Sequence, residues 1–279
     1  MLFKATLAAP LSFARTVGIL ESLLDVVNVD LTPEGIKVIT MDAAHVFVLE
    51  LVLFRREAFL TYQIGRDLIT VGLRLKLLHN VLKHVKADDM VVFSLKDEDD
   101  TFNVSILKSG VLEKKSEYKI CQIVLDQERI SMPDREYCCE ILMPTSVLAS
   151  SCTELQGLGE QLRIAVSDEE LTLEGNSYKR VVTFLLLNFF FAVVSEMVAG
   201  KVFISKKNGD GIAVQCQEPY SDMFKFSYFA KMAKGTARLP EAEFILLQLG
   251  PESPLSLSYR LERMGALNFF LAPLIEVTE

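Results

Sequence analysis

Basic side chains recur at helical spacing on one side of segments whose other side is apolar. Lys76 and Lys83 lie opposite the leucines of residues 75–85, and Lys231 and Lys234 lie opposite the phenylalanines of residues 223–234. Lysine contacts phosphate without reading base sequence, so the pattern favours an anionic partner such as nucleic acid, with a plain solvated face as the alternative. The candidate phosphate-binding residues are Arg15, Lys76, Lys83, Lys225, Lys231 and Lys234.

The net charge of the chain argues against a protein that coats nucleic acid nonspecifically. It is −8 at pH 7, because 37 acidic residues outnumber 29 basic ones. Contact with nucleic acid must therefore come from basic residues gathered on one face. The segment 145–155 departs from the pattern, because its outward positions Ser146, Ser150 and Thr153 are neutral. Their hydroxyls could still lie near phosphates.

Residue patterns typical of catalysis are missing from the sequence. The three histidines are His45, His79 and His84, and no HExxH, GxSxG or GxxxxGK[ST] motif accompanies them. The five cysteines are odd in number and lack the spacing of a zinc site or a disulfide framework, which favours a reducing compartment. We therefore expect a protein that is not an enzyme, with no metal and no cofactor.

A helix followed by two strands and a tight polar turn between them is repeated four times. In the first repeat, Pro33 and Gly35 suit the hairpin turn. One helix for every two strands predicts an α+β fold, with helices on one face of antiparallel sheets. The predicted helices span about 11–24, 75–85, 145–155 and 223–234, and the predicted hairpins pair 26–31 with 36–41, 89–96 with 101–107, 161–167 with 171–175, and 243–249 with 255–261.

The repeats group in twos, which predicts two similar domains. The segment from Cys121 to Asp134 lacks clean periodicity, carries mixed charge and has a proline near its end. We therefore predict an N-terminal domain at 1–120, an interdomain connector at 121–134 and a C-terminal domain at 135–279.

Two apolar stretches could be mistaken for membrane or targeting segments. Residues 5–14 faintly resemble a signal peptide, but Phe13, Val17, Leu20 and Leu24 continue at helical spacing, which favours a core helix. Residues 181–194 form a run of about 14 uncharged residues, shorter than the roughly 18 that span a bilayer. We expect no membrane segment.

Four stretches resemble one family: MDAAHVFVLEL from Met41, ISMPDREY from Ile130, YRLERMG from Tyr259 and LNFFLAPLIE from Leu267. They are similar to the proliferating cell nuclear antigen family, the sliding clamps of eukaryotes and archaea. The resemblance implies the DNA clamp fold in a homotrimeric ring whose helices face double-stranded DNA. It also implies a nuclear processivity factor for replication and repair, whose partners include DNA polymerase, the clamp loader, flap endonuclease and ligase.

The resemblance further assigns a groove that binds a short partner peptide carrying a glutamine, an aliphatic residue and two aromatic residues. It also implies that the strand holding Tyr118 pairs with the strand holding Tyr178 of a neighbouring subunit. By position, the groove residues are Met41, His45, Val46, Val48, Ile130, Met132, Pro133, Pro254, Phe270, Ala272, Pro273 and Ile275.

The chain also departs from the family pattern. Asp168 stands where the family often has a lysine used for ubiquitin modification, and the run from Thr183 to Gly211 is unusually long and apolar. This run would either extend the subunit contact or fold over its own sheet. The helices carry fewer basic residues than the family pattern. An alternative therefore remains: a subunit of a heteromeric or checkpoint ring that acts as a scaffold. Neutral or acidic residues replace the usual lysine or arginine at Ala14, Glu21, Asn80, Ser150, Thr153 and Ser227.

Overall fold

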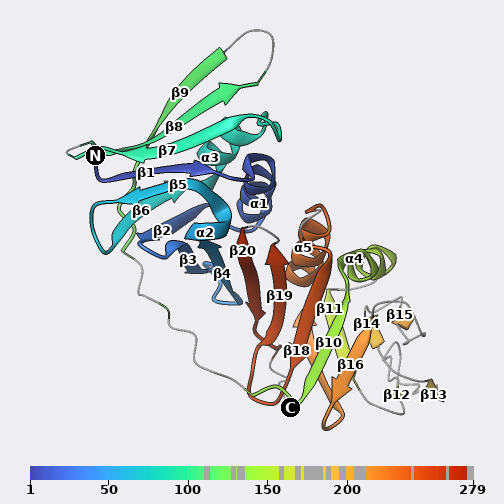
Figure 1. Cartoon of the computed structure of the whole chain (residues 1–279). Coiled ribbons are helices and arrows are strands. Elements are labelled where there is room, and N and C mark those ends of the chain that lie inside the picture. The colour runs from blue at the N-terminus through green and yellow to red at the C-terminus, as the bar shows by residue number, and fades with distance from the viewer. Residues whose placement is uncertain are drawn as a thin grey trace. The chain divides into compact units, whose positions relative to one another are not determined.

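The chain divides into two compact units, each described here by itself (Figure 1). Unit 1 comprises Met1–Ser131, Arg238–Glu241 and Arg260–Asn268, and unit 2 comprises Met132–Ala237, Ala242–Tyr259 and Phe269–Glu279. The main break between the two units follows Ser131, within the connector predicted at 121–134. The predicted domain limits themselves stay a prediction. The computed structural model describes residues 1–97, 99–109, 114–126, 130, 136–156, 160–166, 171–172, 185–186, 190–194, 199–203, 212–239, 242–261 and 264–274.

Unit 1 has two antiparallel arrays of strands. One is a five-stranded sheet in the order β5-β1-β7-β8-β9, and the other has the neighbours β4-β3-β2-β6. The elements are β1 (Phe3–Leu7), α1 (Pro10–Leu23), β2 (Val26–Thr32), β3 (Gly35–Met41), β4 (Phe47–Phe54), α2 (Arg55–Ala58), β5 (Phe59–Ile64), β6 (Ile69–Arg74), α3 (Leu75–Leu82), β7 (Met90–Leu95), β8 (Thr101–Lys108) and β9 (Lys114–Cys121).

The core of unit 1 lies beneath α1 and α3, which pack side by side. Phe13 of α1 reaches Phe93 of β7, with ring centroids 5.3 Å apart. Leu75 and Leu78 of α3 are buried, as the leucine stripe predicts. Gly18 allows the close approach of the helices, because a Cβ there would lie 3.3 Å from Nε2 of His79. Each helix therefore buries one stripe and leaves the other to solvent.

Unit 2 contains the strand neighbours β16-β10-β18-β19 and the antiparallel sheet β15-β14-β11-β17. Its helices α4 and α5 pack against each other. The elements are β10 (Cys139–Pro144), α4 (Thr145–Glu154), β11 (Gln161–Val166), β12 (Leu171–Thr172), β13 (Leu185–Leu186), β14 (Phe190–Val194), β15 (Ala199–Phe203), β16 (Ala213–Cys216), β17 (Tyr220–Lys225), α5 (Phe226–Thr236) and β18 (Phe244–Leu249). The last two strands, β19 (Leu255–Leu261) and β20 (Gly265–Leu271), each have residues in both units.

The α+β class, the antiparallel pairing and the four repeated helices agree with the sequence prediction. Two details were wrong. The fourth helix begins at Phe226 rather than near 223, because residues 220–225 pair with β11 as strand β17. Strand β11 pairs with β14 and β17 rather than with the strand that follows it, so the predicted hairpin of 161–167 with 171–175 is not formed.

Strand β14 comes from the apolar run 183–211. Its register on β11 runs from Gln161 opposite Val194 to Ala165 opposite Phe190. This part of the run therefore joins a sheet of its own unit. No helix in the described part of the chain is long and apolar enough to cross a membrane.

A buried carboxylate fixes the turn that follows α3. Asp89 Oδ2 accepts hydrogen bonds from Lys108 Nζ (2.6 Å) and the backbone amide of Lys86 (2.8 Å), and Oδ1 accepts from the amide of Ser109 (3.2 Å). Lys108 Nζ also donates to the carbonyl oxygen of His84 (2.6 Å). Burial alone would raise the pKa of Asp89, but these hydrogen bonds hold it below its ordinary value. The cluster joins the end of α3 to β8.

We predict that Asp89→Asn lowers the free energy of unfolding by about 2 kcal/mol at neutral pH, because buried donors lose a charged acceptor. Since the folded pKa of Asp89 is depressed, its contribution is present above the unfolded value and is lost as pH falls through the folded one. The variant should therefore show a weaker loss of stability between neutral pH and about pH 3. Urea unfolding at several pH values measures this, with the exposed neighbour Asp88→Asn as control. Equal pH dependence in Asp89→Asn and wild type would contradict the assignment.

Candidate functional site

The candidate phosphate-binding residues of unit 1 lie on or beside its two packed helices. Arg15 on α1, Lys76 on α3 and Lys83 just after α3 are all exposed. Lys83 Nζ donates to Asn80 Oδ1 (3.3 Å). Glu21 of α1 faces His79 of α3, with Oε2 and Nδ1 3.7 Å apart. The helix surfaces of unit 1 thus offer bases for phosphate contact, and that role stays a prediction.

The bases of unit 2 are less uniform than the sequence pattern suggested. Lys225 is exposed but ends β17 instead of lying within the helix, and its amine is 5.5 Å from the ring centroid of Tyr228. Lys231 is exposed, whereas Lys234 is half-buried and donates to Gln156. Lys231 is therefore the base of α5 that lies most open to solvent.

Helix α4 adds little for an anion to contact. Ser150 Oγ donates to the carbonyl oxygen of Val147 and Thr153 Oγ1 to that of Ala149, both at 2.9 Å. Because both hydroxyl protons point at the helix backbone, the expectation that these hydroxyls reach phosphates is not supported.

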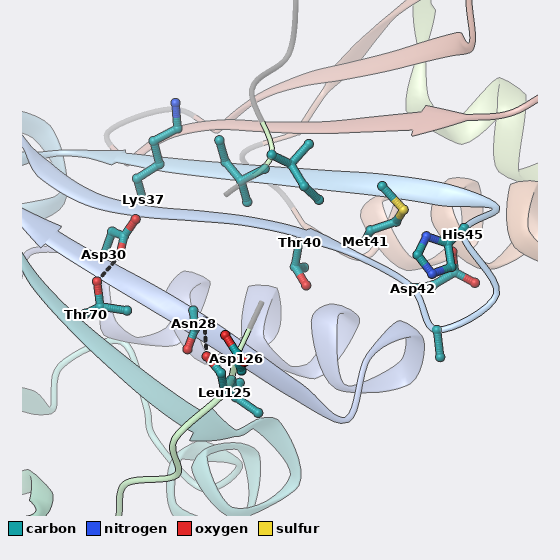
Figure 2. A pocket seen from close by; sticks show the side chains of 13 residues that line it. Asn28, Asp30, Lys37, Thr40, Met41, Asp42, His45, Thr70, Leu125 and Asp126 are labelled. Carbon is teal, nitrogen blue, oxygen red and sulfur yellow. Dashed lines mark hydrogen bonds between the residues drawn. The ribbon is translucent and has the colours of Figure 1, made fainter. Parts of the chain in front are cut away.

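A cavity of about 800 Å³ opens in unit 1 on the outer face of β2 and β3 (Figure 2). Of the predicted groove residues, Met41, His45 and Ile130 line it, whereas Val46 and Val48 are half-buried and lie outside the lining. Sequence reasoning missed the other lining residues, although strand alternation places several of them on this face. They are Asn28, Asp30, Lys37, Ile39, Thr40, Asp42, Ala43, Thr70, Leu125 and Asp126.

One end of the cavity is a tight loop organised by Asp42. Its carboxylate is buried and accepts hydrogen bonds from the amides of Val46 (2.7 Å), Phe47 (2.9 Å) and Ala44 (3.3 Å). His45 adopts a left-handed conformation, with φ of 56°. The loop therefore holds the exposed His45 at the mouth of the cavity (Figure 2). Asp42 is the residue whose hydrogen bonds fix this position.

The opposite wall is the start of the connector. The amide of Ile123 donates to the carbonyl oxygen of Gly72 (3.0 Å), and Asn28 Nδ2 donates to the carbonyl oxygen of Leu125 (3.3 Å). Figure 2 shows the second bond beside Asp126. The connector thereby places Leu125 and Ile130 across from β2 and β3.

The lining combines apolar side chains with polar and charged ones. Thr70 Oγ1 donates to Asp30 Oδ1 (2.6 Å), and Lys37 pairs with Glu50 outside the cavity at 3.1 Å. The Thr40 hydroxyl is buried and lacks a hydrogen-bond partner in the described part of the chain. A bound group could satisfy it. Polar side chains make up more than half of the lining, so a ligand would find hydrogen-bonding groups beside the apolar contacts of Ile39, Met41 and Leu125.

The remaining groove residues belong to unit 2 or to undescribed parts of the chain. Pro254 precedes β19, Phe270 lies in β20, and Ala272 and Pro273 follow it; all four are half-buried. The amide of Leu274 donates to the carbonyl oxygen of Met223 (2.7 Å), which attaches this C-terminal segment to β17. Met132, Pro133 and Ile275 lie outside the described residues.

Strand β9 is an edge strand that carries one of the two predicted interface tyrosines. Within the described residues it pairs with β8 alone, and Tyr118 is 41% exposed. An edge of this kind can accept a further strand. Tyr178 lies outside the described residues, as does Asp168.

The cysteines are mostly core residues. Cys139 and Cys216 lie opposite each other on β10 and β16, with sulfur atoms 3.0 Å apart. Burial, followed by the hydrogen bond with Cys216, raises the pKa of the Cys139 thiol, and burial raises that of Cys152 to about 12. These two thiols stay protonated at neutral pH. No cluster of three metal-binding side chains occurs in the described part of the chain.

Comparison with known proteins matches both halves of the chain to one family. Residues 2–129 match the N-terminal domain of proliferating cell nuclear antigen, and residues 194–274 match its C-terminal domain. A protein of Drosophila melanogaster named proliferating cell nuclear antigen 2 is 25% identical over 272 residues, which cover 98% of this chain and 97% of the relative. The C-terminal match begins at residue 194, inside the apolar run 183–211.

Proposed function

The chain belongs to the proliferating cell nuclear antigen family of DNA sliding clamps, and we propose that three copies form a ring that tethers replication and repair enzymes to duplex DNA. The observation that supports this proposal is the cavity lined by Met41, His45 and Ile130, which are three of the twelve residues of the predicted partner groove. The family consists of non-catalytic clamps. We propose that this chain also lacks an activity of its own and works in the nucleus.

Tethering would use the cavity as a receptor for a short partner peptide. Met41 and Ile130 supply apolar contacts, and the exposed His45 lies at the end of the cavity. Polymerase, clamp loader, flap endonuclease and ligase are the partners that the resemblance implies. A common groove would let them compete for one ring.

Encircling would use the helix surfaces. The exposed bases Arg15, Lys76 and Lys83 of unit 1 and Lys231 of unit 2 can contact phosphates without reading sequence. With few bases and an inert α4 surface, the grip on DNA is weak. A closed ring needs little affinity, because leaving the DNA requires opening the ring.

Ring closure would join the β9 edge, with Tyr118, to the strand holding Tyr178 of the next copy. Main-chain pairing across two such edges is a general way to join chains. A subunit of a heteromeric or checkpoint ring is the second candidate, favoured by the sparse bases and by the α4 hydroxyls that donate to carbonyl oxygens of their own helix. This candidate differs in needing other chains to close.

We predict that the purified chain has a mass in solution three times the 31.3 kDa of one chain. Added with a clamp loader and ATP, it should lengthen the products of a partner polymerase on a primed circular template. Light scattering and product length measure these outcomes. A persistent monomer that leaves product length unchanged would contradict the homotrimer, and a ring that forms only with other clamp subunits would support the second candidate.

Replacing the exposed bases Lys76, Lys83 and Lys231 with alanine should weaken binding of duplex DNA and flatten its salt dependence. Each lost phosphate contact lowers the slope of log affinity against log salt by about 0.9. Titration of fluorescent duplex at several salt concentrations measures the slope. The control removes three exposed bases outside the helices, Lys4, Arg66 and Lys96, and should leave it unchanged. If both triple variants show the same slope of log affinity against log salt, the assignment of phosphate contacts to the helix faces is wrong.

A further inference from the structure

Just before it reaches the cavity, the connector makes one main-chain contact with the edge strand β6. The amide of Gln122 donates to the carbonyl oxygen of Asp100 (2.9 Å), and the amide of Ile123 then donates to that of Gly72 (3.0 Å). Gly72 and Ile123 form an isolated antiparallel bridge, outside the named strands. Beyond this bridge the chain passes the outer face of β2, where Leu125 and Asp126 line the cavity.

This bridge requires a residue without a side chain. A Cβ on Gly72 would lie 2.0 Å from the carbonyl oxygen of Ile123 and 3.0 Å from its carbonyl carbon. Both are backbone atoms, so relief would require the connector itself to move. Gly72 is not among the described glycines with positive φ, so the requirement comes from close approach and not from backbone conformation.

A second contact comes from the residue directly across the sheet. Asn28 of β2 pairs in register with Gly72 of β6, and its side-chain amide donates to the carbonyl oxygen of Leu125 (3.3 Å). One cross-strand pair thus holds the connector at two points two residues apart. Asn28 also lines the cavity (Figure 2).

We propose that Gly72 and Asn28 are positioning residues that fix the connector as the cavity wall and so set the width of the partner groove. Gly72 permits the main chain of Ile123 to dock, and Asn28 fixes the direction of the chain that follows. The inference rests on the proposed function, because it assigns the cavity to partner peptides.

The test compares Gly72→Ala with Gly65→Ala. A Cβ on Gly65 would meet its nearest neighbour, the carbonyl oxygen of Leu2, at 3.6 Å, an ordinary contact distance. The probe is a synthetic fluorescent peptide with one glutamine, one aliphatic residue and two adjacent aromatic residues. Affinity is measured by fluorescence anisotropy, and hydrogen exchange by mass spectrometry reports the amides of residues 121–126, with β8 as internal reference.

In Gly72→Ala we expect exchange of the Ile123 amide to rise at least about tenfold and the peptide to bind about tenfold more weakly, a loss of about 1.4 kcal/mol. Exchange in β8 should stay unchanged, which a general loss of stability would not allow. Gly65→Ala should match wild type in both. Asn28→Ala should raise exchange of the same segment, which keeps the proposal testable if Gly72→Ala does not fold.

The outcomes separate this inference from the proposed function. If wild type binds the peptide and both Gly72→Ala and Asn28→Ala match it in affinity and exchange, the positioning role is wrong and the clamp function stands. If exchange rises in the variants but wild type itself does not bind the peptide, the docking contact is real and the assignment of the cavity to partner peptides is wrong.

Discussion

The packing of two helices against antiparallel strands is the constraint on which each unit depends. A helix in this position must bury one stripe, and Phe13 of α1 against Phe93 shows how completely it does so. The opposite stripe is left to solvent, and in unit 1 it carries Arg15 and Lys76. The same packing that makes the core therefore creates a surface whose charge can vary without loss of the fold. Asn80 of α3 lies on this exposed surface, whereas Ala14 of α1 is buried.

Strand alternation applies a matching constraint to the outer face. Residues 28 and 30 of β2 and 37, 39 and 41 of β3 point away from the helices and line the cavity. The face becomes a groove only because the connector runs across it, attached at Gly72 and Asn28. A sheet surface that would otherwise be flat thus gains a second wall from a short segment of main chain.

The regular elements could be predicted from sequence because apolar periodicity and turn residues such as Pro33 and Gly35 act locally. Local signals failed where a distant strand competes: β17 extends to Lys225 because it pairs with β11, and β14 joins β11 from about 25 residues away. The residues near Met41 were assigned to a groove through family resemblance, and that assignment stays a prediction. Asn28 and Gly72 were missed because their role depends on Ile123 and Leu125, whose course no local pattern encodes.

A clamp combines two properties: a groove that holds partners and a ring that stays on DNA with little affinity for it. The direct test of the second is retention on circular and linear DNA. The protein is loaded onto a nicked circular plasmid, washed at a salt concentration that removes ionic contacts, and counted before and after a single double-strand cut. The account predicts that it stays on the circle through the wash and is lost after the cut. Loss from the circle during the wash, or retention on the cut plasmid, would contradict encirclement.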